Sequence, residues 1–267
     1  NNKHMVLQLK KEAYRLIDAL TFQYRRSAFK PIAEEISFGA NGNSKGVDVG
    51  ENISLEGKID RVDKYKNYFR VIDYKTGHID LASKTTYYGE KIQLFSYLLA
   101  TKNEKLKPAG AFYLPIRNVF IDENEGTNFS TYKMQGYFVN DPEIIKAFDE
   151  KIAFENNKSD VVNVTISTSK ENKETGTITA TGSNALTSDE LEGLIEYTKK
   201  IATGATKEIL SGYIKPSPLE SDGRTPCDYC DYKYACGRDF NSNLEVRKSR
   251  ANITLENFID KGKSDDR

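Results

Sequence analysis

The feature that most constrains the fold is GKIDRVDKYKNYFRVIDYKTG, residues 57–77, in which apolar and polar residues alternate on both sides of a short polar turn. This alternation is typical of two strands joined as a β-hairpin, with the turn at residues 66–67. The expected register places Asp60 directly opposite Asp73, and the two-residue period of a strand puts Lys75 on the same face. A three-residue turn or a β-bulge would shift that register.

Two carboxylates that face each other on a hairpin repel, so a cation is expected between Asp60 and Asp73. Carboxylate oxygens suit a hard divalent ion such as Mg²⁺ or Mn²⁺, and the Lys75 ammonium could steady negative charge that develops on a phosphate. Phosphodiester hydrolysis requires this arrangement. An Asp-x-Lys sequence after a hydrophobic run is common, however, so the alternative is a set of solvated strand residues.

Helix and strand patterns surround the hairpin. Apolar residues at helical spacing predict an amphipathic helix over 7–29, and an apolar stripe predicts another helix over 87–103. Residues 31–39 and 108–116 have the composition of strands, the second with few charges, as expected of a buried strand. Helix, strand, hairpin, helix and strand in this order indicate an α/β core.

The second half of the chain has weaker patterns. We expect a strand within 131–140, a short helix within 141–154, and a polar hairpin or a mobile excursion over 161–182. A longer helix is expected over 188–212, because serine and acidic residues at its start can cap it. The sequence shows no internal repeat.

Composition narrows the functional class only slightly. Lysine and arginine total 39 in the 267 residues, and aspartate and glutamate also total 39, so a nucleic-acid or membrane partner must be met by a local patch. No stretch approaches the roughly 20 apolar residues of a membrane span, and the first residues lack a secretory signal pattern. The sequence therefore predicts a soluble, intracellular protein.

Three cysteines, Cys227, Cys230 and Cys236, are crowded into one loop-like segment. An odd number so close together suits a metal site better than a disulfide framework. Thiolates at this spacing can bind one soft metal or a cluster, but three ligands leave one coordination position open. A reduced, empty loop and a zinc ion with an unassigned fourth ligand are the alternatives.

The motifs, taken in order, resemble a known family. GKIDRVD, VIDYKTG and GEKIQLFSYLLA are similar to motifs II and III and the Q-x-x-x-Y helix of the RecB-like branch of the PD-(D/E)XK nucleases. With TPCDYCDYKYACG near the end, the chain resembles the C-terminal nuclease domain of AddB-type subunits of bacterial helicase-nucleases. The resemblance covers residues 7–239, weakly over 118–187. It implies a restriction-endonuclease-like core, with a mixed central sheet flanked by helices and a C-terminal cysteine-containing segment.

The resemblance also implies roles for residues of the hairpin. Asp60 and Asp73 would hold the metal ion, and the main-chain carbonyl of Tyr74 would add an oxygen ligand. Lys75 would orient the attacking water and stabilise the transition state.

Gln93 and Tyr97 match the helix motif of the family, and residues four apart share one face of a helix, directed at the site or at the DNA backbone. A polar and an aromatic residue on a packed helix is the alternative. The chain departs from the family at the first motif, where relatives have an upstream histidine ligand. His4 lies too close to the N-terminus for that role, which indicates a fragment that begins after the histidine. His78 and Glu35 are expected on the surface, although Glu35 could assist the metal site.

In the resembling family, a fourth cysteine far upstream completes a 4Fe–4S cluster that joins the two ends of the nuclease domain. This sequence has no cysteine beyond the three already named. The family therefore implies a cluster that is incomplete in this chain.

DNA contact is expected in the segment that follows Lys75. It combines positive charge with aromatic rings that could stack on bases, and the predicted DNA-binding residues are Lys84, Tyr87, Tyr88 and Lys91. A solvated loop with two packed tyrosines is the alternative. The family implies DNA, single-stranded or double-stranded, as substrate and an AddA-like protein as partner, in the cytoplasm with the nucleoid.

These observations predict one nuclease domain over 1–240, with its core in 30–118, accessory segments in 119–215, the cysteine segment in 216–240, and a tail over 241–267. The predicted activity is Mg²⁺-dependent hydrolysis of DNA, exonucleolytic on single strands, within a bacterial helicase-nuclease that processes double-strand breaks for recombination. A catalytically silent DNA-binding or scaffold module of the same fold is the first alternative. A stand-alone Cas4-like exonuclease is the second, although the long second half of the chain argues against that compact family.

Overall fold

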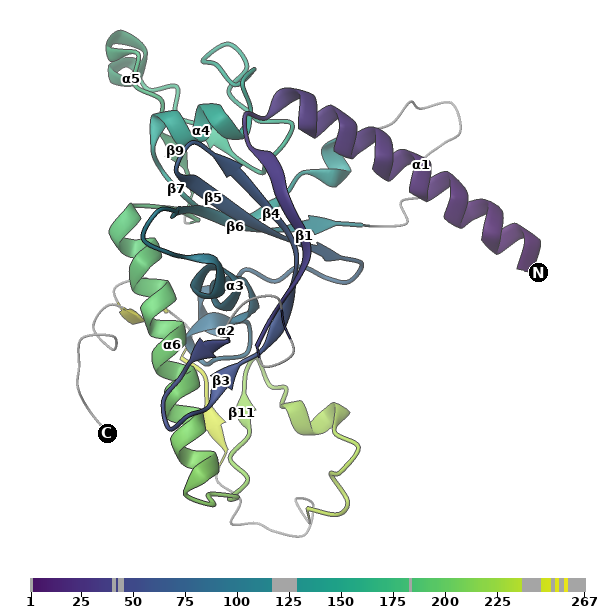
Figure 1. Ribbon diagram of the computed structural model, residues 1–267, viewed down its shortest axis with the longest axis vertical. Helices are drawn as coiled ribbons and strands as arrows, with labels where there is room; N and C mark the ends of the chain where they lie inside the picture. Colours follow the sequence, from purple (N-terminus) through teal and green to yellow (C-terminus); the bar gives the residue numbers. More distant parts are fainter. Residues whose placement is uncertain are drawn as a thin grey trace.

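A computed structural model defines the fold (Figure 1). The structure describes residues 2–39, 42, 46–116, 129–182, 184–236, 246–250, 253–254 and 257–258. Its helices are α1 Asn2–Arg26, α2 Ser83–Tyr87, α3 Gln93–Thr101, α4 Pro142–Phe148, α5 Lys170–Thr175 and α6 Ser188–Leu210, with 3-10 turns η1 Phe129–Tyr132 and η2 Pro226–Tyr229. Its strands are β1 Lys30–Phe38, β2 Val47–Asp48, β3 Ser54–Leu55, β4 Gly57–Tyr65, β5 Tyr68–Lys75, β6 Lys107–Pro115, β7 Gln135–Val139, β8 Thr165–Ile166, β9 Ala180–Thr181, β10 Ala185–Leu186, β11 Leu219–Glu220 and β12 Arg247–Lys248.

A six-stranded mixed sheet forms the centre, in the order β1-β4-β5-β6-β7-β10. The strand pairs β1–β4, β4–β5 and β6–β7 are antiparallel, whereas β5–β6 and β7–β10 are parallel. Parallel neighbours need a long crossover, and α2 and α3 provide it between β5 and β6. The mixed sheet flanked by helices confirms the predicted fold class.

The hairpin has the predicted register. Arg61 pairs with Ile72 and Tyr65 pairs with Tyr68, so the turn consists of two residues. Lys66 has a φ of +51°, the left-handed conformation that a tight two-residue turn requires. The register therefore brings Asp60 and Asp73 to neighbouring positions on adjacent strands.

The two faces of the sheet differ in their cover. Helix α4 packs on one face, where Phe148 contacts the rings of Phe112 and Phe138. Helices α3 and α6 cover the other face, where Phe95 of α3 meets Tyr137 of β7 (Figure 1). Because successive side chains of β5 alternate between these faces, Asp73 and Lys75 point toward α3.

Several elements differ in extent from the prediction. The helix expected over 87–103 is confirmed only as α3, Gln93–Thr101, because Gly89 has a φ of +81° that interrupts helical geometry ahead of it. The short helix α2 was not predicted. In the segment 161–182, β8 and β9 form a short antiparallel pair, but the helix α5 lies between them. The predicted helix within 141–154 is α4, and the Asp141 carboxylate caps its first turn as expected.

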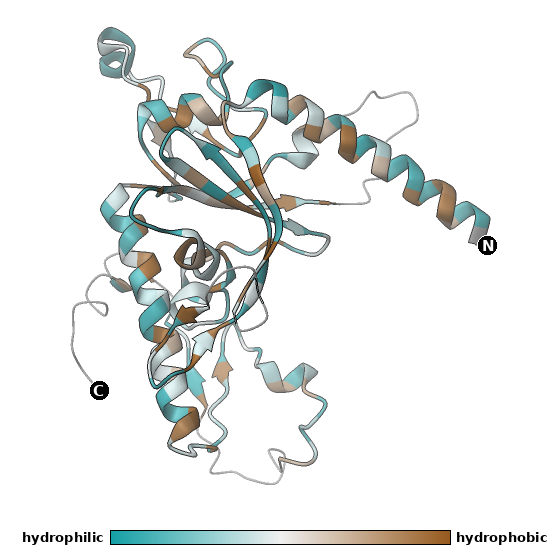
Figure 2. Ribbon diagram, in the orientation of Figure 1, coloured by the Kyte–Doolittle hydropathy of each residue, from teal (hydrophilic) through white to brown (hydrophobic). Residues whose placement is uncertain are grey.

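Helix α1 begins at Asn2 and extends well past the edge of the sheet (Figure 1). Hydrophobic and hydrophilic residues alternate along it (Figure 2). Leu16 and Leu20 pack against the core, whereas Leu9 and Ile17 are exposed. None of the described helices, α1 included, is long and apolar enough to cross a membrane.

A buried charge network joins β4 to β5 on the α4 side of the sheet. The fully buried Asp63 carboxylate accepts two hydrogen bonds of 2.7 Å from Arg61 and bonds of 2.8 and 2.9 Å from Arg70. The Arg70 guanidinium lies 5.0 Å from the ring centre of Phe29 and 5.8 Å from that of Phe148. Burial alone would raise the pKa of Asp63, but Arg70 and Arg61 outweigh it and hold that pKa below its ordinary value.

Replacement of Asp63 tests this network. Asp63→Asn leaves two buried guanidinium groups without their counter-ion, so we expect the free energy of unfolding at pH 7 to fall by about 3–5 kcal/mol. The lowered pKa means that the carboxylate stabilises the fold above about pH 4 and loses this effect as the pH falls through its folded pKa. The difference between wild type and variant should therefore narrow in acid, measured by urea unfolding across pH.

The matched control is Glu143→Gln, which removes an exposed carboxylate that pairs with Lys66. An exposed pair contributes little, so this variant should unfold close to wild type. An equally small effect of Asp63→Asn would contradict the account of the network.

Candidate active site

The site lies where β4 and β5 part. The last pair of their ladder is Arg61 with Ile72. Beyond it, the N–H of Tyr74 donates a 2.8 Å hydrogen bond to the Asp60 carboxylate. The Asp60 side chain is thereby fixed at the opening between the strands, beside Asp73.

Asp73 is only 4% exposed, and one oxygen of its buried carboxylate lacks a well-aligned hydrogen-bond donor among the described residues. Its Oδ2 lies 2.9 Å from Lys75 Nζ, yet this atom makes no hydrogen bond of good geometry within the described residues. Burial raises the pKa of Asp73, the Lys75 ammonium lowers it, and the charge of Asp60 raises it further, with a net rise. The position favours an additional positive charge.

Lys75 connects the strands to α3. Its side chain is one-third exposed, and its Nζ donates a 2.9 Å hydrogen bond to Gln93 Oε1. Gln93 Nε2 in turn donates to the Tyr97 hydroxyl at 2.8 Å. Burial, and to a lesser extent Asp73 and Asp60, raise the pKa of Tyr97, so the phenol stays neutral. The structure thus gathers the hairpin residues and both residues of the helix motif.

The donor set fits a hard divalent cation. The carboxylates of Asp60 and Asp73 lie beside the main chain of Tyr74. The Tyr74 carbonyl points to the same edge of β5 as its N–H, which bonds Asp60, so this oxygen faces the carboxylates as well. The incompletely bonded Asp73 Oδ2 is the atom that a cation would satisfy. In the described part of the chain, no group of three or more His, Cys, Asp or Glu side chains could hold a metal ion. A cation here would therefore depend on the two carboxylates, a main-chain oxygen and water.

The other acidic or histidine candidates form no metal-binding group with Asp60 and Asp73 within the described residues. His4 is exposed on α1, and His78 is exposed beyond the end of β5. The exposed Glu35 forms a 2.6 Å ion pair with Lys58, and its φ of +53° is unusual for a strand residue. The structure agrees with surface roles for all three.

The cysteine segment is open. Cys227 and Cys230 are partly exposed, and Cys236 is exposed with its Sγ 3.6 Å from the Lys233 carbonyl oxygen. Within the described residues the three thiols do not assemble into a metal-binding group. The arrangement does not fit a 4Fe–4S cluster.

The predicted DNA-contact residues have different surroundings. The Tyr87 ring stacks on Tyr197 at 5.9 Å and meets the ring of Tyr88 edge-on at 5.1 Å. Lys84 forms an ion pair with Asp222. Lys91 is exposed. The rings are thus partly occupied in packing against α6.

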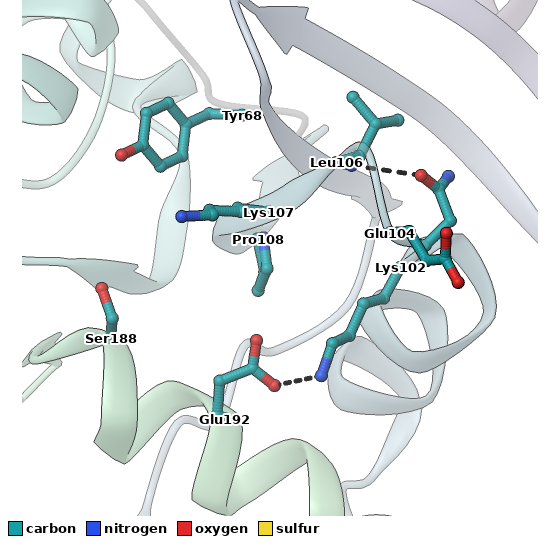
Figure 3. Close-up of a pocket in the computed structure, with 9 residues that line it drawn as sticks. Tyr68, Lys102, Glu104, Leu106, Lys107, Pro108, Ser188 and Glu192 are labelled. Atoms are coloured by element: carbon teal, nitrogen blue, oxygen red, sulfur yellow. Dashed lines mark hydrogen bonds and ion pairs between the residues drawn. The ribbon is translucent and has the colours of Figure 1, made fainter.

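One hollow lies away from the site. A cavity of about 390 Å³ is lined by Tyr68, Lys107 and Glu192 among others (Figure 3). Tyr68 begins β5 and pairs with Lys107, whereas Lys75 ends β5 and pairs with Pro115. The cavity is therefore at the opposite end of the strands from Asp73 and Lys75.

Tyr113 is a residue of this site that no pattern in the sequence predicted. It lies on β6 beside Asp73, and its ring centre is 5.1 Å from Lys75 Nζ. Tyr113 lies near Lys75 because β5 and β6 pair in parallel, although a crossover separates them in the sequence. No local sequence pattern predicts that pairing. Only a prediction of strand order could have identified it.

Comparison with known proteins assigns the family. The profile described as the PD-(D/E)XK nuclease superfamily matches residues 2–237, and the chain belongs to this superfamily. Among curated relatives, it is 33% identical to an AddB-type protein of Clostridium novyi, named as a subunit of an ATP-dependent helicase/deoxyribonuclease, over 91% of this chain and 22% of the relative. It is 36% identical to the protein of the same name in Carboxydothermus hydrogenoformans, over 84% of this chain and 22% of the relative. The chain therefore spans about a fifth of the length of these curated relatives.

Neutralising Asp73 tests the electrostatics of the site. A raised pKa means that the ionised carboxylate opposes folding, and the penalty grows as the pH rises above about 4 through the folded pKa. Asp73→Asn should therefore unfold at a higher temperature than wild type in EDTA at pH 7, with a smaller difference near pH 4. Calorimetry measures both, with Asp18→Asn on the exposed side of α1 as control. A lower unfolding temperature for Asp73→Asn would show that Lys75 satisfies the carboxylate.

Proposed function

We propose that this chain is a metal-dependent deoxyribonuclease domain that hydrolyses phosphodiester bonds. The observation that carries the proposal is the convergence of Asp60, Asp73 and Lys75 around a buried, incompletely bonded carboxylate oxygen. The superfamily match and the names of the relatives support the same chemistry.

Asp60, Asp73 and the Tyr74 carbonyl would hold Mg²⁺ or Mn²⁺, which supplies Lewis-acid activation of the phosphate and of a water molecule. The Tyr74 N–H orients the Asp60 carboxylate toward this position. As the water oxygen bonds to phosphorus it would release its proton to solvent, while the bond to the leaving oxygen breaks and that oxygen takes a proton from solvent water. The Lys75 ammonium would donate hydrogen bonds that hold the attacking water and offset the developing negative charge.

Gln93 and Tyr97 support Lys75 in this mechanism. The Gln93 oxygen accepts from the ammonium, and its amide donates to the Tyr97 hydroxyl, so the rotamer of Lys75 is set from α3. Pre-positioned groups act without reorganisation during the reaction.

The relatives suggest the setting of this activity. Because the chain spans about a fifth of proteins named as helicase/deoxyribonuclease subunits, we propose that it acts within a helicase-nuclease with an AddA-like partner. Its substrate would be single-stranded DNA at the ends of double-strand breaks, degraded exonucleolytically in the cytoplasm. The cysteine segment enters no step of the mechanism, because its thiols do not form a group within the described residues.

A catalytically silent module of the same fold is the second candidate. It is favoured by the ligand set, which contains two side-chain carboxylates and no third acidic, histidine or cysteine ligand in the described residues. Such a module would keep the fold and bind DNA without cleavage.

Removal of the Lys75 amine distinguishes an active nuclease from a catalytically silent module. Lys75→Met keeps a long side chain but lacks the charge, so Mg²⁺-dependent cleavage of a single-stranded oligonucleotide should fall about 10²–10³-fold. The matched control, Lys64→Met, changes an exposed lysine of β4 and should cleave as wild type does. Equal residual cleavage by wild type and Lys75→Met, or none by wild type, would support the silent module.

We also propose that the DNA path is bordered by four residues before α3, namely Lys84, Tyr87, Tyr88 and Lys91. Lys91 offers the sharpest test because it is exposed near the start of α3. Lys91→Gln should weaken binding of single-stranded DNA in EDTA and reduce the slope of log affinity against log salt by about 0.7, the value for one lost phosphate contact. The control is Lys105→Gln, an exposed lysine just before β6, at the end of the sheet away from Lys75. Identical slopes for both variants would place the DNA elsewhere.

A further inference from the structure

The ring of Tyr113 forms one side of the Lys75 environment. In the parallel ladder of β5 and β6, Tyr113 is the partner of Asp73, so it lies on the face that carries Lys75. Tyr113 is 4% exposed, and its ring centre lies 5.1 Å from Lys75 Nζ. This separation is within the range of a cation–π interaction.

Lys75 has two other described contacts, and both are hydrogen-bonding groups. They are Asp73 Oδ2 and Gln93 Oε1, each 2.9 Å from Nζ. A lysine ammonium is a compact charge on a flexible four-carbon stem, so its position depends on the groups around it. One-third of the side chain is open to solvent, and the amine can leave in that direction.

We infer that Tyr113 is a positioning residue, which holds the Lys75 ammonium at the site by the face of its ring. This inference rests on the proposed function, because it assigns Tyr113 a part in the same reaction. When Asp73 engages a cation, its attraction for Lys75 is shared, and Gln93 and the Tyr113 ring are the contacts left to retain the amine. The ring is suited to this because it attracts a cation without competing as a ligand for a hard metal ion.

The state of the phenol agrees with this role. Burial, with a smaller contribution from Asp73, raises the pKa of Tyr113 to about 12. The side chain is therefore neutral during catalysis at physiological pH, and the aromatic face is the part that meets the ammonium.

Two substitutions separate the ring from the hydroxyl. Tyr113→Leu removes the aromatic face from a buried position, and Tyr113→Phe removes only the hydroxyl. We expect Tyr113→Leu to lower kcat for single-stranded DNA cleavage about tenfold with little change in KM. Tyr113→Phe, which keeps the ring, should retain a kcat close to that of wild type. Thermal unfolding of each variant shows whether it is folded. Equal losses in both variants would overturn the inference and indicate that the hydroxyl contacts the substrate.

A second measurement does not depend on activity. With lysine labelled at ¹³Cε in the full chain, a ring face above the amine moves the Lys75 ε-proton signal upfield of the other lysines, and Lys75→Met identifies that signal. The upfield shift should persist in Tyr113→Phe and disappear in Tyr113→Leu. An unshifted Lys75 signal in wild type would overturn the inference.

The two experiments distinguish failure of the inference from failure of the proposed function. Wild type that cleaves, a Lys75→Met variant that does not, and a Tyr113→Leu variant that equals wild type would retain the nuclease and exclude the positioning role. Absent cleavage by wild type would remove the nuclease function, and with it the catalytic role of Tyr113.

Discussion

The burial of the Asp73 carboxylate, with the charge of Asp60 as a smaller addition, is the constraint on which the site depends. Over most of the hairpin the two strands pair through their main chains. Beyond the pair of Arg61 with Ile72, the Tyr74 N–H instead donates a hydrogen bond to the Asp60 carboxylate. The Asp73 carboxylate is buried and Asp60 is partly buried, and the Lys75 ammonium offsets only part of the cost of burying the Asp73 charge, since the pKa of Asp73 remains raised. The fold thus holds an unfavourable charge arrangement that a divalent cation would relieve.

The rest of the domain keeps this arrangement rigid. The parallel pairing of β5 with β6 requires a crossover, and that crossover brings α3 over the same face, where Gln93 reaches Lys75. Helix α6 then packs on α3 and closes the layer. Local destabilisation at the site is tolerated because it is surrounded by a continuous apolar core, as is common where function requires strain.

The hairpin and its register could be predicted from the sequence because both depend on a short periodicity, whereas the helix motif came from the resemblance to the family. The two-residue period of strands places Asp60, Asp73 and Lys75 on one face. Gln93 and Tyr97 were identified by the resemblance to the family's helix motif, and their four-residue spacing puts them on one helical face. The neighbours of these residues depended on long-range packing and could not be read in the same way. Tyr113 reaches Lys75 only through strand order. The late start of α3, relative to the helix expected from residue 87, follows from one glycine, Gly89, within an otherwise helical pattern.

Tyr74 joins the two faces of the sheet. Its N–H holds Asp60 at the site, and its hydroxyl lies 3.4 Å from a guanidinium nitrogen of Arg61, which is itself fixed by the buried Asp63. The charge network on the α4 side therefore restrains the residue whose main chain orients the carboxylate on the opposite side. Although Arg70 Nη1 has no hydrogen-bond partner among the described residues, the four hydrogen bonds to Asp63 restrain this part of β4 without contact with the reacting groups. The segment DRVD thus contributes one residue to the site and two to its support, which accounts for the charges on both faces of an otherwise buried strand.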